Sequence, residues 1–209
     1  MNLDDIVAYI QRPTVEWQDN RDTVKLPWDI TPDKYIKFAQ DEIVAKDERS
    51  VINALSNAKR ALACQVDSLL LAFGLDAACE KWSFPRKLER LEMIGIIAPS
   101  VLKKINKERN EMEHGYALPD REAIVDFVGI VALFIAATNR HIFNRRCYME
   151  YSELGDTYLP LIIKLTHEGL HVSTAGPGWT DQQELDVPIT SLEEYSRLLG
   201  AINRSLGPW

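Results

Sequence analysis

The chain has 209 residues, of which 46% are hydrophobic and 26% charged, and its formal net charge is −7. This length and apolar content are enough to bury a core, which excludes a disordered chain. The acidic balance excludes broad, non-specific attraction to nucleic acid, so any such contact has to come from a local cluster of basic residues.

Three cysteines, without C-x-x-C spacing or a nearby histidine pair, favour a reducing compartment. Residues 1–10 alternate acidic with apolar side chains and lack the features of a signal peptide, so a short helix is expected there. The longest apolar run, residues 127–137, is too short to cross a bilayer. We therefore expect a cytoplasmic protein with no membrane contact.

Residues 11–32 contain three prolines and no apolar period, which predicts an irregular arm. Thr31-Pro32 is typical of an N-cap followed by the first helical residue. Apolar residues then recur at three- and four-residue steps over residues 33–73, which predicts one long helix or two helices joined near Lys46.

Gly74 is a natural helix end, and Phe84-Pro85 begins a shorter helix that ends near Gly95. A third body helix is expected from about residue 100 to 114. Pro119-Asp120 opens another, which reaches about residue 143 and is apolar on two sides. A homodimer interface would cover its second side.

The tail changes character after Tyr151. Alternating residues 159–165 and 170–173 predict a β-hairpin, and Ser191 begins a last helix. The expected fold is mainly α: an antiparallel bundle of four to five helices with a small C-terminal β-hairpin plus helix appendage. The expected divisions are an arm at 1–32, a helical bundle at 33–150 and an appendage at 151–209.

The segment Arg109–Tyr116 places a cation, an amide, an imidazole and a phenol within about two helical turns. Arg109 lies four residues after Ile105 and three before Met112, so it falls on the apolar stripe of its helix. A charge at that position indicates a partner or ligand.

The stretch from Arg49 to Phe143 resembles an HEPN domain, on the run Phe84–Leu91 and on Ile105–Asn110 followed by His114. The resemblance implies a helical homodimer that cleaves RNA without metal, with arginine and histidine from both subunits in one cleft. The spacing Arg-x4-His-x-Tyr is similar, more narrowly, to toxins paired with nucleotidyltransferase antitoxins, and that similarity implies a possible antitoxin or nucleotidyltransferase partner.

Each residue type suits a step of RNA cleavage through 2′-hydroxyl attack. His114 can carry protons near neutral pH, and Arg109 can neutralise charge at phosphorus. Asn110 can hold the imidazole or a phosphate oxygen, and Glu113 can orient Arg109. Tyr116 can stack on a base or donate to phosphate.

Simpler interpretations remain open at the same residues. Arg109 and Glu113 also suit an i,i+4 ion pair, His114 suits a charge-complementing helix end, and Tyr116 suits packing. The alternative function is a non-catalytic HEPN scaffold that binds a nucleotide or a protein partner.

Two groups of basic residues are placed to contact RNA phosphates, although a solvated face is the simpler interpretation of such lysines. The groups are Lys103, Lys104 and Lys107, and then Arg140, Arg145 and Arg146 with His141 among them. The four histidines show no metal-ligand spacing, so neither a metal nor a cofactor is expected.

Overall fold

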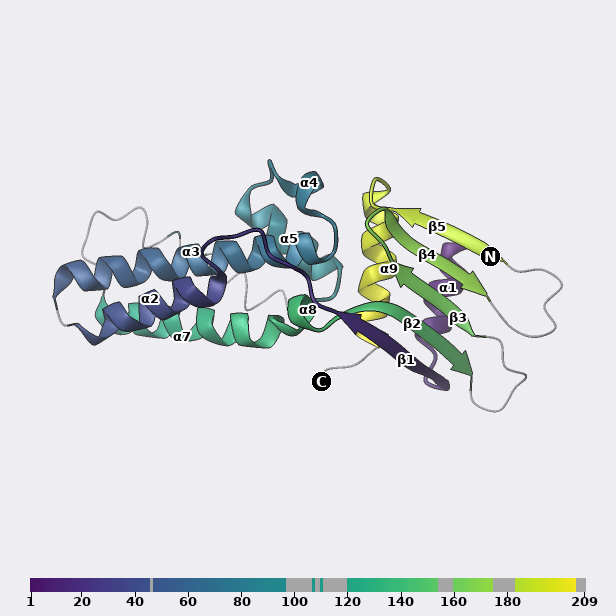
Figure 1. Ribbon diagram of the computed structural model, residues 1–209, viewed down its shortest axis with the longest axis horizontal. Coiled ribbons are helices and arrows are strands. Elements are labelled where there is room, and N and C mark those ends of the chain that lie inside the picture. The colour runs from purple at the N-terminus through teal and green to yellow at the C-terminus, as the bar shows by residue number, and fades with distance from the viewer. Residues whose placement is uncertain are drawn as a thin grey trace.

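A computed structural model describes residues 1–45, 47–96, 107, 110, 120–153, 160–174 and 183–205. These residues form a mixed α/β fold in which a layer of long helices adjoins a five-stranded antiparallel sheet (Figure 1). The helices are α1 (Leu3–Ile10), α2 (Pro32–Val44), α3 (Glu48–Ala72), α4 (Asp76–Cys79), α5 (Phe84–Met93), α7 (Arg121–Thr138), α8 (Arg140–Phe143) and α9 (Leu192–Ser205). The strands are β1 (Val15–Asp22), β2 (Arg145–Glu153), β3 (Leu161–Leu165), β4 (Gly169–Thr174) and β5 (Glu184–Pro188).

The helical layer is built around α3, which packs against α2, α5 and α7. One side of α3 is lined by fully buried small residues, Ala54, Ala58 and Ala61, which let its neighbours approach closely. Residues 33–73 form two helices rather than one, because Asp47 caps a new helix by accepting a hydrogen bond from the Ser50 amide at 3.0 Å.

The other helix boundaries follow local signals. The Thr31 side chain accepts from the Lys34 amide and Pro32 is the first residue of α2, as predicted. Gly74 and Gly95 end α3 and α5 with φ of 70° and 75°, a conformation that favours glycine. The short N-terminal helix is also confirmed as α1.

Helix α7 buries one side against α3 and leaves another apolar side exposed. Ile124 and Val131 are buried, whereas Leu133 is 72% and Val125 42% exposed. Together with α8 it is the one helical stretch among the described residues that is long and apolar enough to cross a membrane by length and composition alone. A core helix meets the same criterion, and the contact with α3 is the role that the structure shows for it.

The prediction of a small C-terminal hairpin is wrong. Strands β3 and β4 do pair as predicted, but they form the centre of a sheet with the order β1-β2-β3-β4-β5. Helices α1 and α9 contact each other beside this sheet, so the first and the last helix of the chain pack together there (Figure 1). The face of the sheet in the core carries fully or nearly fully buried residues, among them Met149, Tyr151, Ile163 and Val172.

The sequence pattern did not predict β1 and β2, which pair at one side of the sheet, or β5, which is the edge strand at the other side. Strand β1 is an edge strand within the predicted irregular arm, and its sequence VEWQDNRD lacks apolar alternation because most of its side chains stay exposed. It forms because β2 offers it a pairing partner over its whole length, from Val15 opposite Glu153 to Asp22 opposite Arg145. Long-range pairing of this kind leaves little local signal.

Polar contacts join the helical layer to α9, the helix beside the sheet. The Tyr195 hydroxyl in α9 donates to the Phe73 carbonyl at 2.6 Å, and Arg90 in α5 donates to Ser196 Oγ at 2.8 Å. Asn203 donates to the Ile94 carbonyl at 2.7 Å. Because these donors and acceptors are buried or partly buried, the two parts are held in one arrangement.

Replacing Tyr195 by phenylalanine is expected to lower the free energy of unfolding by about 1 to 2 kcal/mol, because the buried Phe73 carbonyl loses its donor. Urea unfolding followed by circular dichroism measures the change. Tyr148→Phe is the matched control, since its hydroxyl donates to Glu150 over a longer 3.2 Å. Equal losses in the two variants would show that the Tyr195 hydrogen bond stabilises the fold no more than the Tyr148 hydrogen bond does.

Candidate site: an arginine-lined cavity between helices and sheet

The described residues include only part of the predicted HEPN site. Lys107 and Asn110 are helical and exposed. The other predicted residues of that segment lie outside the described residues: Lys103, Lys104, Arg109, Glu113, His114 and Tyr116. Their roles stay predictions.

The second predicted basic group does converge, at the junction of the helical layer and the sheet. Arg140, Arg145 and Arg146 line one cavity of about 130 Å³, together with Arg21 from β1 and His141 from α8. The remaining described lining residues are the amides Asn144 and Asn203 and the apolar residues Phe73, Met149, Leu165, Leu170, Leu199 and Ile202. Within the described part of the chain, no carboxylate lines this cavity.

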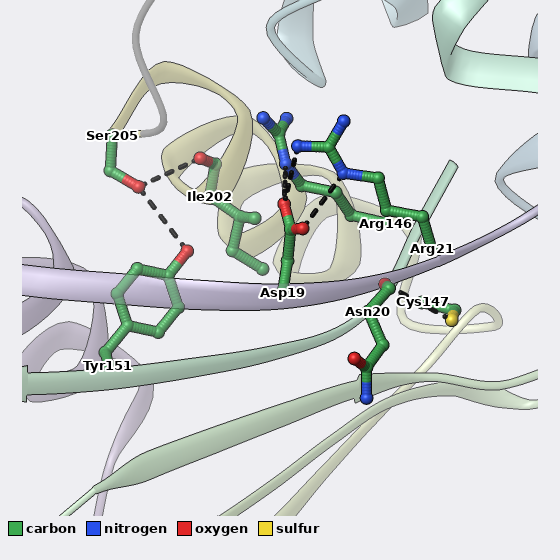
Figure 2. Close-up of polar contacts among 8 residues, drawn as sticks. All are labelled: Asp19, Asn20, Arg21, Arg146, Cys147, Tyr151, Ile202 and Ser205. Atoms are coloured by element: carbon green, nitrogen blue, oxygen red, sulfur yellow. Dashed lines mark hydrogen bonds and ion pairs between the residues drawn. The ribbon is translucent and has the colours of Figure 1, made fainter. Parts of the chain in front are cut away.

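Asp19 fixes two of these arginines side by side (Figure 2). Its Oδ2 accepts from Arg146 Nε at 2.6 Å and its Oδ1 accepts from Arg21 Nε at 2.9 Å. The side chains of Asp19 and Arg146 are each only 8% exposed. Burial raises the pKa of the Asp19 carboxyl, but the hydrogen bonds from both arginines outweigh it, and the net pKa lies below its usual value.

Arg145 is held by a carboxylate and a backbone carbonyl. Its Nε and Nη2 donate to the two oxygens of Asp22 at 2.9 and 2.5 Å, and its Nη1 donates to the Ala72 carbonyl at 2.6 Å. This bidentate contact joins β1, β2 and the end of α3. These contacts fix the orientation of the Arg145 guanidinium, which lines the cavity.

His141 is a buried, neutral imidazole on the helical side of the cavity. Only 9% of the residue is exposed, and its ring lies 6.1 Å from the Phe73 ring. Burial, followed by the charges of Arg140 and Arg146, lowers the pKa of His141 to about 4. The Arg140 Nε donates to its Nε2 at 3.3 Å, which assigns the proton of the neutral ring to Nδ1.

This arrangement is suited to binding an anion rather than to proton transfer at neutral pH. The planar guanidinium fork matches carboxylate and phosphate oxygens, and the apolar walls strengthen such contacts. A histidine with a pKa of about 4 is a weak base and is almost fully deprotonated at pH 7. The residues that line the cavity therefore suit anion binding better than acid–base catalysis.

Metal and thiol chemistry gain no support from the described residues. Among them no group of three or more His, Cys, Asp or Glu side chains is placed to hold a metal ion. Cys64, Cys79 and Cys147 are all free thiols, and burial raises the pKa of Cys64 and of Cys79 to about 11. These two thiols are protonated at neutral pH and hence poor nucleophiles.

Arg21 and Asp19 are the site residues that the sequence pattern did not indicate. They lie in the arm that was expected to be irregular, more than 100 residues before Arg146. The sequence signal for them was the pattern Asp19-x-Arg21-Asp22, whose carboxylates pair with Arg145-Arg146. This pairing becomes visible only once the β1–β2 register is known.

Comparison with known proteins gives no match: no family model, no curated protein and no solved structure is significantly similar to this chain. The resemblance to HEPN domains consequently rests on the residues quoted for it.

Proposed function

We propose that this chain is a metal-independent endoribonuclease of the HEPN type, which cleaves RNA through 2′-hydroxyl attack. Arg109 and His114 are its catalytic pair, with Asn110, Glu113 and Tyr116 in support. The protein acts in the cytoplasm as a homodimer, and a toxin or defence role with an antitoxin or nucleotidyltransferase partner belongs to the same proposal.

The observation that carries the proposal is the convergence of Arg140, Arg145, Arg146 and Arg21 around one cavity in a protein of net charge −7. Local clusters of arginine are what an acidic protein needs in order to bind a polyanion. This cluster begins directly after α7, at the end of the helical layer.

The exposed side of α7 supports the homodimer. Besides Leu133 and Val125, it carries Gly129, where an added Cβ would have no atom within 4 Å. An apolar helix face with a glycine allows another helix to approach closely. A second copy of the chain, related by a two-fold axis, would cover this face on both subunits.

The test is cleavage of a mixed-sequence RNA in the presence of a chelator by the wild type, Arg109→Ala and His114→Ala. We expect the wild type to leave 2′,3′-cyclic phosphate and 5′-hydroxyl ends. Each variant is expected to cleave at least about a hundredfold more slowly, the usual effect of losing a charge stabiliser or a proton carrier. Gel electrophoresis with end-group analysis gives both readouts.

The matched controls are Arg12→Ala and His167→Ala, whose side chains are 53% and 91% exposed and lie outside the cavity. Both are expected to cleave at the wild-type rate. Equal activity in the wild type, Arg109→Ala and His114→Ala would reject the catalytic assignment, because a contaminating nuclease survives these substitutions.

The second candidate is a non-catalytic HEPN scaffold that binds a nucleotide or a protein partner. The small cavity and the neutral His141 favour it, since both suit binding without turnover. RNA that is bound but left intact by the wild type would select this candidate.

A further inference from the structure

Two arginines face each other across the β1–β2 ladder at the cavity. Arg21 is the register partner of Arg146, and like charges in directly opposite positions destabilise a sheet. The register shifts beside this pair, so Cys147 is an extra residue in β2, a β-bulge of the kind found next to binding sites. The strand pairing thus places two cations together where packing alone would separate them.

The cavity has the size of one small anionic group. Its volume is about 130 Å³. Pockets for larger organic ligands take about 300 to 1,000 Å³. A phosphate group fits within this volume.

The environment of the arginines favours a doubly charged group. Burial lowers the pKa of Arg146, whose side chain is 8% exposed, and also that of the more exposed Arg140. The described residues that line the cavity include four arginines and the neutral imidazole of His141, and no carboxylate is among them. A dianion relieves this local repulsion more than a monoanion does.

We propose that this cavity binds a phosphate monoester, as found at the end of an RNA strand or on a mononucleotide, with Arg21, Arg140 and Arg146 contacting its oxygens. A monoester carries close to two negative charges at neutral pH and has one substituent, which can extend out of the cavity through one opening. A diester inside a strand carries one charge and two substituents, which need an open groove. The proposal goes beyond the nuclease activity and stands without it.

The test is calorimetric titration of the full chain with methyl phosphate and with dimethyl phosphate at pH 7.5. Methyl phosphate is expected to bind at one site, at least tenfold more tightly than dimethyl phosphate. Equal affinities, or no saturable binding of methyl phosphate, would overturn the proposal. Neither probe contains a ribose, so the outcome is independent of RNA cleavage.

Arg140→Gln and Arg146→Gln are each expected to weaken methyl phosphate binding about tenfold or more, because each removes a charge-assisted contact. Arg140 is exposed and takes no part in strand pairing, so its variant retains the fold even if Arg146→Gln does not. Arg197→Gln is the control, since Arg197 pairs with Asp4 away from the cavity. Wild-type affinity in Arg140→Gln and in a folded Arg146→Gln would also overturn the proposal.

The affinities of 2′-deoxy oligonucleotides, which the proposed chemistry cannot cleave, show which kind of molecule supplies the phosphate group. A 5′- or 3′-phosphorylated oligonucleotide that binds more tightly than methyl phosphate identifies a strand end, and equal affinities identify a small phosphorylated molecule. Either result supports the proposal. Hydroxyl-ended and phosphorylated oligonucleotides of equal affinity contradict it.

Discussion

Replacing Asp19 by alanine is expected to lower the free energy of unfolding by about 3 to 5 kcal/mol, the usual cost of removing one partner from a buried ion pair. Asp19 and Arg146 are each 8% exposed and lie 2.6 Å apart, so water screens their attraction weakly. The substitution also leaves Arg21 opposite Arg146 without the carboxylate between them. Urea unfolding followed by circular dichroism measures the loss.

Asp41→Ala is the matched control, because the Asp41 side chain is 59% exposed in its i,i+4 pair with Lys37. Its expected cost is about 0.5 kcal/mol or less. Inorganic phosphate should also raise the melting temperature of Asp19→Ala more than that of the wild type, since the anion takes over the role of the missing carboxylate. Equal losses in Asp19→Ala and Asp41→Ala would show that the Asp19 contacts contribute no more than a surface pair.

The helices were predictable because their signals are local. Thr31-Pro32 and Asp120 cap their own helices, and Gly74 has a positive φ at the end of α3. Such signals depend on three or four neighbouring residues. They carry the same information in the isolated sequence as in the folded chain.

The sheet was only half predictable. Strand β3 alternates buried with more exposed positions, as in Leu161 and Ile163 against Lys164, so the hairpin was recognised. Strand β1 has no such alternation, and β2 begins with two arginines that were predicted only to follow a helix ending near residue 143. Each of these two strands forms by pairing with the other, although more than 100 residues separate them in the sequence.

The candidate site shows the same division. Arg140, Arg145 and Arg146 were predicted to contact phosphate because they are close in sequence, and they do line one cavity. Arg21 and Asp19 required the β1–β2 register, and the cavity itself required α9 to pack against the sheet. A sequence pattern can thus place one wall of such a site but not the site as a whole.

Acidification from pH 7 to pH 4 is expected to lower the free energy of unfolding by about 3 kcal/mol through His141 alone. The pKa of His141 is about 4 in the folded protein, against 6.5 for the same group in water. Between these two pKa values His141 binds a proton in the unfolded state but not in the folded state, so the free energy of unfolding falls as the pH falls. Each unit of pKa difference contributes about 1.4 kcal/mol.

The dependence on His141 is separated by measuring urea unfolding from pH 7 to pH 4 in buffers without phosphate. His141→Gln is expected to flatten the curve in this window, because glutamine does not titrate and can still accept from Arg140. His167→Gln should keep the wild-type slope, since His167 has a side chain that is 91% exposed. Asp19, whose folded pKa is lowered, loses its stabilising charge below its unfolded value of about 3.9, which lies under the window. A wild-type slope in His141→Gln would place the acid sensitivity elsewhere, and it would mean that water reaches the imidazole of His141.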